Sequence, residues 1–338
     1  MDVASWSMAR VGVSMTGLPT VRTSERSAFH RCPQQWYWKY RMGLVPKGAA
    51  DDNLWLGIGV HEALAQWYKK GKRRGIHPGD YFAGWAADEV RYIRTVTEDE
   101  DALVKYEDAK ELGIEMLYGY IEEYGKDPSW DVIATEHPFS VRVTSGGQPV
   151  ANFASAWDGV YRDLEDGYIY LMEHKTANQI STPYLEMDPQ GGAYWAVASQ
   201  VLRAQGVLKA GEVIAGITYN FLRKAIPDDR PRDEQGRYLN KDGTVSKRQG
   251  TPRFVRHLVE RTPGEMKQEL QDLANEVAWM HAIKSGQLPI LKSRTRDCPW
   301  CPFWDMCKLH QHGGDSWREL LSDYDQVDPY EERRKAAL

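Results

Sequence analysis

The sequence lacks a long apolar segment and a secretory leader. No stretch of its 338 residues approaches the about 20 consecutive apolar residues that a membrane-spanning helix requires. The first ten residues, MDVASWSMAR, lack the charged start and apolar run of a signal peptide. Hydrophobic residues make up 42% and charged residues 27%, which is typical of folded globular proteins. We therefore expect a cytoplasmic protein without membrane contact.

The chain also lacks an excess of positive charge. It carries 43 Lys and Arg against 48 Asp and Glu, a net charge of −5. This excludes an overall basic surface, but it allows nucleic-acid binding through a local basic groove. A local excess occurs from Arg223 to Arg261, where 11 basic and 6 acidic residues give +5. Within this segment, residues 225–253 carry Pro, Gly and turn signals that predict an extended hairpin or a mobile insertion.

Cysteine is scarce, and a disulfide framework is not expected in a reducing compartment. The four cysteines are Cys32, Cys298, Cys301 and Cys307. The last three form C-x2-C-x5-C, and the first lies 298 − 32 = 266 residues upstream. There are three interpretations: isolated thiols, zinc held by the four cysteines with His310 or His312 available as replacement ligands, and a [4Fe–4S] cluster. The CPWCP turn argues against isolated thiols, while spacing alone does not separate zinc from iron–sulfur.

Hydrophobic periodicity predicts an α/β fold without internal repeats. A helix from Ser24, interrupted at Pro33, is followed by helices over 54–70, 80–95, 102–124, 188–205 and 262–285. Strands are predicted over 131–143, 151–163, 167–174 and 213–223, the first three as a meander. Thr262, followed three residues later by Glu265, marks the start of the last helix. We expect a mixed central sheet flanked by helices, with a helical N-terminal part.

Three charged residues fall at the ends of neighbouring predicted strands. Asp158 comes late on one strand, and Glu173 and Lys175 end the next. Antiparallel strands lie about 5 Å apart, so Asp158 and Glu173 can share a cation. Two carboxylates suit Mg²⁺ or Mn²⁺, and a nearby lysine can hold a water or stabilise a charged phosphate. Two carboxylates and a lysine are the groups that metal-assisted phosphodiester hydrolysis uses. The alternative is an ordinary surface salt bridge, which the apolar YIYL segment before Glu173 disfavours.

Six short motifs occur in a fixed order between residues 24 and 310. They are Cys32-Pro33, G-x3-H (Gly57, His61), Asp158, E-x-K (Glu173, Lys175), Q-x3-Y (Gln190, Tyr194) and C-x2-C-x5-C. This ordered set resembles the PD-(D/E)XK nuclease superfamily, specifically the RecB-like branch with an iron–sulfur cluster. That branch includes the AddB nuclease domain, CRISPR-associated adaptation nucleases and phage-encoded exonucleases. Trp157 stands where the family name has Pro.

The resemblance implies a role for each matching residue. The implied metal ligands are His61, Asp158, Glu173 and the backbone carbonyl of His174. Lys175 resembles the catalytic lysine, and Glu136 weakly matches an acidic position on the first strand. The plain alternative for His61 is a structural histidine on an apolar helix.

Two further groups complete the implied site. Gln190 and Tyr194 resemble the pair that positions DNA and the active site, and the alternative is a helix face packed on the sheet. The four cysteines match the iron–sulfur signature, which implies a structural [4Fe–4S] cluster. Excess charge beside a nuclease core favours phosphate contact by the insertion over a merely solvated hairpin. The residues predicted to bind DNA are Arg237, Lys241, Lys247 and Arg248.

The resemblance implies a divalent-metal-dependent DNA exonuclease that acts on DNA ends in phage recombination or repair, with a recombination protein as a further partner. The alternative is a non-catalytic DNA-binding or recombination-partner module with a relic nuclease site. The intact Asp158, Glu173 and Lys175 argue against a relic.

The same interpretation divides the chain into three parts. The predicted parts are a flexible arm over 1–23, one nuclease domain over 24–312 and a charged tail over 313–338. Within the domain we expect a helical part (54–125), a nuclease core (131–223), the basic insertion (225–253) and a C-terminal helix with the cysteine cluster (262–310).

Overall fold

The computed structural model describes residues 7–8, 18–47, 52–228, 230–313 and 316–329. Contacts group the chain into two compact units. The first unit comprises Met1–Ala49, Phe139–Ser155 and Lys267–Leu338, and the second comprises Ala50–Pro138 and Ala156–Met266. Two contact clusters can belong to one folding domain, so the single domain over 24–312 stays a prediction.

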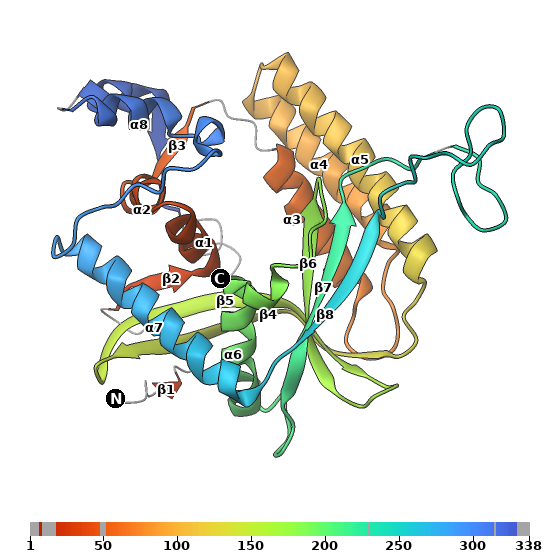
Figure 1. The fold of residues 1–338 in the computed structure, drawn as a ribbon, viewed down its shortest axis with the longest axis horizontal. Coiled ribbons are helices and arrows are strands. Elements are labelled where there is room, and N and C mark those ends of the chain that lie inside the picture. Colours follow the sequence, from red (N-terminus) through yellow and green to blue (C-terminus); the bar gives the residue numbers. More distant parts are fainter. Residues whose placement is uncertain (1–6, 9–17, 48–51, 229, 314–315, 330–338) are drawn as a thin grey trace. The chain divides into compact units, whose positions relative to one another are not determined.

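A mixed sheet forms the centre of the fold (Figure 1). Its strands are β1 (Ser7–Met8), β2 (Thr20–Arg22), β4 (Trp130–Ser145), β5 (Gln148–Asp163), β6 (Ile169–Ala177), β7 (Ile214–Arg223) and β8 (Phe254–Glu260). The order is β1-β4-β5-β6-β7-β8, with β2 paired to β5. β6 and β7 are parallel, while β5 with β6 and β7 with β8 are antiparallel. The predicted mixed α/β sheet is confirmed, and β8 is a strand that the sequence analysis did not assign.

Helices cover both faces of the sheet in the second unit (Figure 1). These are α3 (Asp52–Trp67), α4 (Pro78–Val96) and α5 (Glu100–Tyr124) on one face and α6 (Pro189–Ala204) on the other. The core under the first three contains the fully buried Leu64, Phe82 and Met116. α6 connects β6 to the parallel β7, as a crossover helix does. All four helices match predicted ones within three residues at either end.

The first unit contains the interrupted helix that Pro33 predicts. α1 (Thr23–Arg31) ends before Cys32, whose backbone is extended, and α2 (Pro33–Trp36) starts with proline in its first turn. A π-helical turn, Tyr37–Arg41, follows. Elements near the C-terminus complete this unit. They are the greater part of α7 (Pro263–Lys284), η3 (Cys298–Trp300), α8 (Trp304–Gln311), η4 (Ser316–Asp323) and β9 (Tyr324–Gln326). β9 pairs with β3 (Leu44–Pro46), which follows the π-helical turn.

Parts of the predicted arm and tail are regular structure. The arm contains β1 and β2, and the tail contains η4 and β9. Positions 1–6 and 9–17 of the arm, and 314–315 and 330–338 of the tail, lie outside the described residues. No helix in the described part of the chain combines the length and the apolar character needed to cross a bilayer.

Candidate active site

The candidate site lies where the pairing of β5 with β6 stops. The described ladder runs from Arg162 and Ile169 to Gly159 and Met172. One residue further along each strand stand Asp158 and Glu173. Here the Asp158 side chain accepts a hydrogen bond from the backbone N–H of His174, with 2.6 Å between nitrogen and Oδ2. The Asp158 carboxylate thus accepts the hydrogen bond of a strand amide, and this bond fixes the orientation of the Asp158 side chain.

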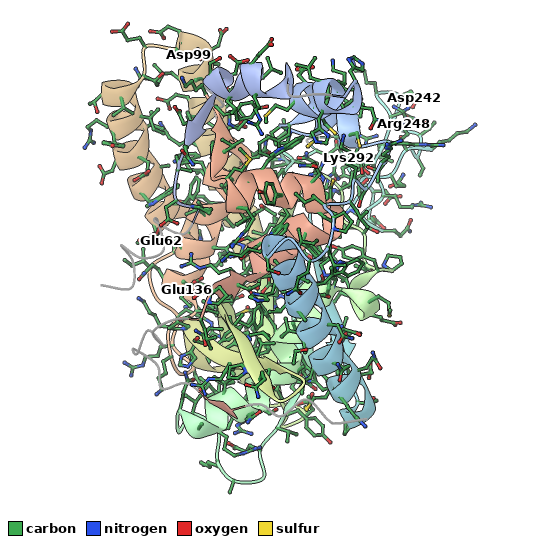
Figure 2. The ribbon with its side chains drawn as sticks, turned by 90° about the vertical axis from the view of Figure 1, so that its left-hand side faces the viewer. Glu62, Asp99, Glu136, Asp242, Arg248 and Lys292 are labelled. Atoms are coloured by element: carbon green, nitrogen blue, oxygen red, sulfur yellow. The ribbon has the colours of Figure 1, made fainter. Side chains whose placement is uncertain are left out.

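His61 and Glu136 bring two more ligand atoms to Asp158. Nδ1 of His61, on α3, lies 3.2 Å from Oδ1 of Asp158. The ligand atoms of His61, Glu136 and Asp158 all lie within 4.8 Å of one another. Glu136 is exposed on β4, on the side that faces the viewer in Figure 2. Its φ of 43° is unusual for a residue other than glycine, and such backbone strain concentrates at functional sites.

Glu173, Lys175 and Gln190 form a hydrogen-bonded triangle. Lys175 Nζ donates to Glu173 Oε1 at 2.8 Å and to Gln190 Oε1 at 2.7 Å. Gln190 Nε2 donates to the same Glu173 oxygen at 2.6 Å. Glu173 is only 5% exposed, so it needs both donors. The E-x-K strand and the Q-x3-Y helix therefore meet through three side chains.

The start of α6 holds Gln190 in this triangle. Asp188 caps the helix by accepting hydrogen bonds from the backbone amides of Gln190 and Gly191. Tyr219 of β7 donates its hydroxyl to Asp188 at 2.8 Å. A Cβ on Gly191 would lie 1.8 Å from the Tyr219 hydroxyl oxygen, so the close approach of helix and strand requires glycine. Tyr194 lies one turn further along α6 and is 5% exposed; its predicted role stays a prediction.

Burial and neighbouring charge set the protonation of the site. Burial lowers the pKa of His61, but the charge and hydrogen bond of Asp158 outweigh it and raise this pKa to about 9. Burial raises the pKa of Asp158, but His61 lowers it to about 2. Burial, opposed by Lys175, raises the pKa of Glu173 to about 7. Burial lowers the pKa of Lys175, but Glu173 raises it above its usual value. At neutral pH His61, Asp158 and Lys175 are therefore charged.

His174 faces away from this triangle. Strand alternation points its side chain to the opposite face from Glu173 and Lys175. The ring stacks near Tyr68, with 6.0 Å between centroids, and Nδ1 lies 2.8 Å from Asn220 Nδ2. Burial lowers the pKa of His174 to about 3, so the ring is neutral.

The four cysteines line one cavity in the first unit, together with Arg31, Lys292 and Arg294. All four thiols are free, and neither His310 nor His312 lines the cavity. Burial raises the pKa of Cys301 and of Cys307, and nearby cationic side chains oppose it. The backbone N–H of Thr295 points to Cys298 Sγ at 3.3 Å. The structure thus gathers the remote cysteine with the three C-terminal ones.

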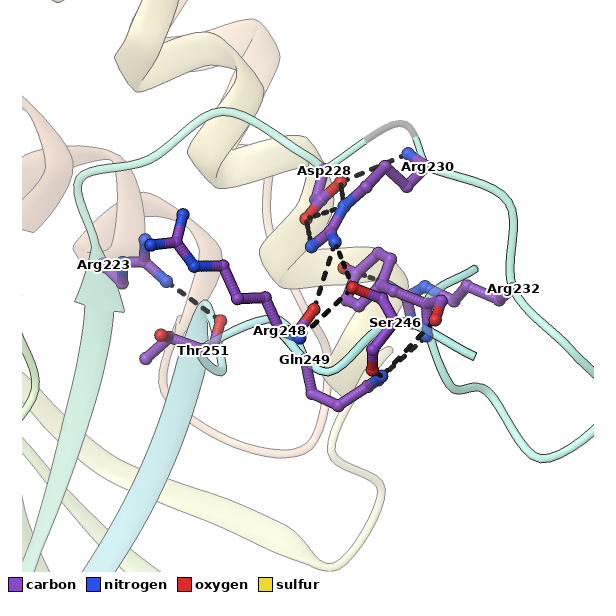
Figure 3. A network of polar contacts seen from close by, with 9 residues as sticks. Arg223, Asp228, Arg230, Arg232, Ser246, Arg248, Gln249 and Thr251 are labelled. Carbon is purple, nitrogen blue, oxygen red and sulfur yellow. Dashed lines mark hydrogen bonds and ion pairs between the residues drawn. The ribbon is translucent and has the colours of Figure 1, made fainter. Parts of the chain in front are cut away.

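The basic insertion is a small lobe held together by polar contacts, among them those of Arg230, Ser246 and Gln249 (Figure 3). Isolated bridges join Arg232 to Tyr238 and Leu239 to Val245. The guanidinium groups of Arg230 and Arg232 lie 4.6 Å and 4.4 Å from the Tyr238 ring. Hydrogen bonds to Asp228, Ser246 and the Arg248 carbonyl hold Arg230 in place. Part of the positive charge seen in the sequence therefore stabilises the lobe itself.

The four residues predicted to contact DNA differ in their surroundings. Arg237 pairs with Asp233 at 2.7 Å. Lys241, Lys247 and Arg248 are exposed, and no ion pair is described for any of the three. The lobe therefore presents these three cations to solvent.

The fold and the site define a class of protein, a nuclease built on a mixed sheet with an acidic cluster and a lysine at its strand ends. A sequence model of the PD-(D/E)XK nuclease superfamily matches residues 23–308. The chain therefore belongs to the PD-(D/E)XK nuclease superfamily. Members of this superfamily are generally metal-dependent nucleases that use Mg²⁺ or Mn²⁺, with DNA as the implied substrate. No curated protein matches the chain as a relative.

Proposed function

We propose that this chain is a divalent-metal-dependent DNA exonuclease of the RecB-like iron–sulfur branch, acting on DNA ends in recombination or repair. The observation that carries the proposal is the convergence of His61, Glu136 and Asp158 within 4.8 Å, together with the ion pair of the buried Glu173 and the half-buried Lys175. The action on ends, the phage setting and the recombination-protein partner rest on the resemblance of the ordered motifs.

The donor set fits Mg²⁺ or Mn²⁺. Carboxylate and carbonyl oxygens are the ligands that these cations prefer, and Mn²⁺ also accepts imidazole. His61, Asp158 and Glu173 would hold the ion with the His174 carbonyl, and Glu136 is placed to join them. A bound cation would supply positive charge at the scissile phosphate.

The chain's own groups account for the remaining chemistry. Lys175, held by Glu173 and Gln190, presents an ammonium group that can hydrogen-bond the attacking water or the phosphate. The side-chain amide of Gln190 fixes the direction of the Lys175 side chain, because its oxygen accepts from Lys175 while its nitrogen donates to Glu173. Asp188 and Tyr219 fix Gln190 in turn.

A degradation assay tests the activity. Linear DNA labelled at the 5′ or 3′ end, single- or double-stranded, is incubated with Mg²⁺ or Mn²⁺ beside a covalently closed circle. Linear DNA should be degraded from an end while the circle persists, and EDTA or Glu173→Ala should abolish the reaction. Rapid nicking of the circle would exclude an exonuclease. Activity that survives in EDTA would exclude a metal-dependent site.

We further propose that the cysteine cavity holds a structural [4Fe–4S] cluster. The four cysteines line one cavity, and four thiolates suit [4Fe–4S]. The resemblance of the ordered cysteine motif to that of the iron–sulfur branch favours this cluster over zinc. Purified protein should be brown and carry roughly four irons per chain. A colourless protein with one zinc would overturn this proposal.

The insertion is the proposed grip on DNA. Lys241, Lys247 and Arg248 are exposed without a described ion pair, so they are available to phosphates. Arg237 can contribute only in competition with Asp233.

A further inference from the structure

A row of polar side chains crosses three strands on the face that α3 and α5 cover. His174 on β6 is in register with Asn220 on β7, and Asn220 is in register with Arg256 on β8. Asn220 is fully buried and His174 is 2% exposed. Buried polar groups on an otherwise apolar face are costly unless each finds a partner.

Arg256 anchors the row at one end. Its guanidinium binds Asp127 through Nη1 at 2.5 Å and Nη2 at 2.9 Å. The same Nη2 donates to the hydroxyls of Tyr68 at 2.9 Å and Tyr120 at 2.7 Å. The group also lies 3.7 Å from the centroid of the Tyr124 ring. These contacts fix the orientation of the Arg256 guanidinium group.

The donor role of Arg256 determines which atoms of Asn220 and His174 donate and which accept. Arginine only donates, so the Asn220 atom 3.4 Å from Arg256 Nε is the acceptor Oδ1. Asn220 Nδ2 then faces His174 Nδ1 at 2.8 Å and the Tyr120 hydroxyl at 2.9 Å. Because Nδ2 is a donor, the neutral His174 ring accepts at Nδ1 and carries its proton on Nε2. The row therefore fixes both the orientation and the tautomer of His174.

The row leads directly to the proposed metal ligands. The His174 backbone N–H donates to Asp158 Oδ2 at 2.6 Å, which leaves Oδ1 beside His61. Tyr68, directly after α3 and two turns beyond His61, donates to Asp127 at 2.7 Å. Arg256 thus contacts Tyr68, directly after the helix that carries His61, and the amide of His174 contacts Asp158.

We propose that Asn220 and Arg256 are positioning residues of the divalent-metal centre. They hold His174 so that its amide orients Asp158 and its carbonyl stays at the site. This inference rests on the proposed metal-dependent function.

Mn²⁺ binding without DNA provides the first test. Asn220→Leu removes the contact to His174 at similar volume, and Asn220→Asp replaces the donor by an acceptor. Both variants should bind Mn²⁺ about 10- to 100-fold more weakly than wild type, as is typical when a partner of a metal ligand is lost. Thr218→Val is the matched control, because it removes a buried hydrogen bond to Tyr161 two residues away on the same face of β7. Its Mn²⁺ affinity should stay within about twofold of wild type, since it does not touch His174.

The tautomer of His174 provides a second readout, because a general loss of packing around the site would not transfer the proton from one ring nitrogen to the other. In full-length protein labelled with ¹⁵N-histidine, wild-type His174 should carry its proton on Nε2, and Asn220→Asp should move it to Nδ1. The wild-type measurement stands even if every Asn220 variant fails to fold. A wild-type proton on Nδ1, Asn220 variants that bind Mn²⁺ as wild type does, or an equal loss in Thr218→Val would each overturn the inference. Wild-type protein that binds no Mn²⁺ would instead remove the proposed metal site itself.

Discussion

Metal binding to this site should release protons in an amount that depends on pH. The pKa of His61 is about 9 and that of Glu173 about 7 in the metal-free protein. A cation must displace both protons before it can use these ligands. At pH 8 His61 is mostly protonated and Glu173 mostly ionised, so binding should release about 1 proton. At pH 7 half of the Glu173 population adds its proton, and the release should be about 1.5.

The same values fix the slope of affinity against pH. Because a raised pKa means a proton that is held more tightly, acid competes with the metal and affinity must rise with pH. Between pH 7 and 9 the displacement of the His61 proton gives about a tenfold gain per pH unit. Below pH 7 both sites are protonated, and the slope steepens to about a hundredfold per unit.

Calorimetric titration with Mn²⁺ in buffers of different ionisation enthalpy counts these protons. His61→Asn should lower the release at pH 8, where His61 supplies nearly all of it. His77→Asn is the control, because His77 caps α4 through its side chain and asparagine is itself a good cap. A release near zero at pH 8, or an affinity that does not change with pH, would refute the reasoning.

Three further outcomes are expected. Lys175→Ala should cut nuclease activity by orders of magnitude while the protein stays folded, because the ammonium is proposed to act on the transition state; wild-type turnover in this variant would remove lysine from the mechanism. Cys32→Ser should lose iron and melt at a lower temperature, since the proposed cluster would close a loop worth on the order of 5–6 kcal/mol in the chain-entropy model; unchanged melting would contradict a stapling role. Neutralising the insertion should weaken DNA binding and reduce its salt slope by about 0.7 per lost contact on single strands, with little effect at saturating DNA; an unchanged slope would show that it does not touch phosphates. The residues to neutralise are Lys241, Lys247 and Arg248.

Local signals predicted much of this fold. Pro33 indicated the break between α1 and α2, and the capping box of Thr262 and Glu265 is present at the start of α7, where Thr262 N donates to Glu265 at 2.6 Å. The spacing of Glu173 and Lys175 placed both on one face of β6, as their shared contact with Gln190 shows. The pair Asp188-Pro189 also carries a helix-start signal in the sequence, with Asp188 as the cap and proline in the first turn.

Strand register and backbone strain could not be predicted from the sequence. The row of His174, Asn220 and Arg256 depends on how three strands align, and β8 comes 31 residues after β7. Glu136 reaches the site through a φ of 43° that no residue pattern indicates. Charge counting likewise included Arg256 in the local basic excess, whereas its side chain is paired with Asp127 beneath the helices. Such contacts join positions that are far apart along the chain.

The placement of the insertion makes it an exchangeable module. It connects β7 to β8, which are adjacent antiparallel strands, and its base is closed by a backbone hydrogen bond from Arg223 to Arg253 at 2.7 Å. In topological terms the lobe is an oversized hairpin turn. Its length can therefore change at a small cost in loop-closure entropy while the strand register is kept. An engineered chain could carry a tight turn or a different binding module there, so that the proposed grip on DNA and the proposed cleavage are tuned separately.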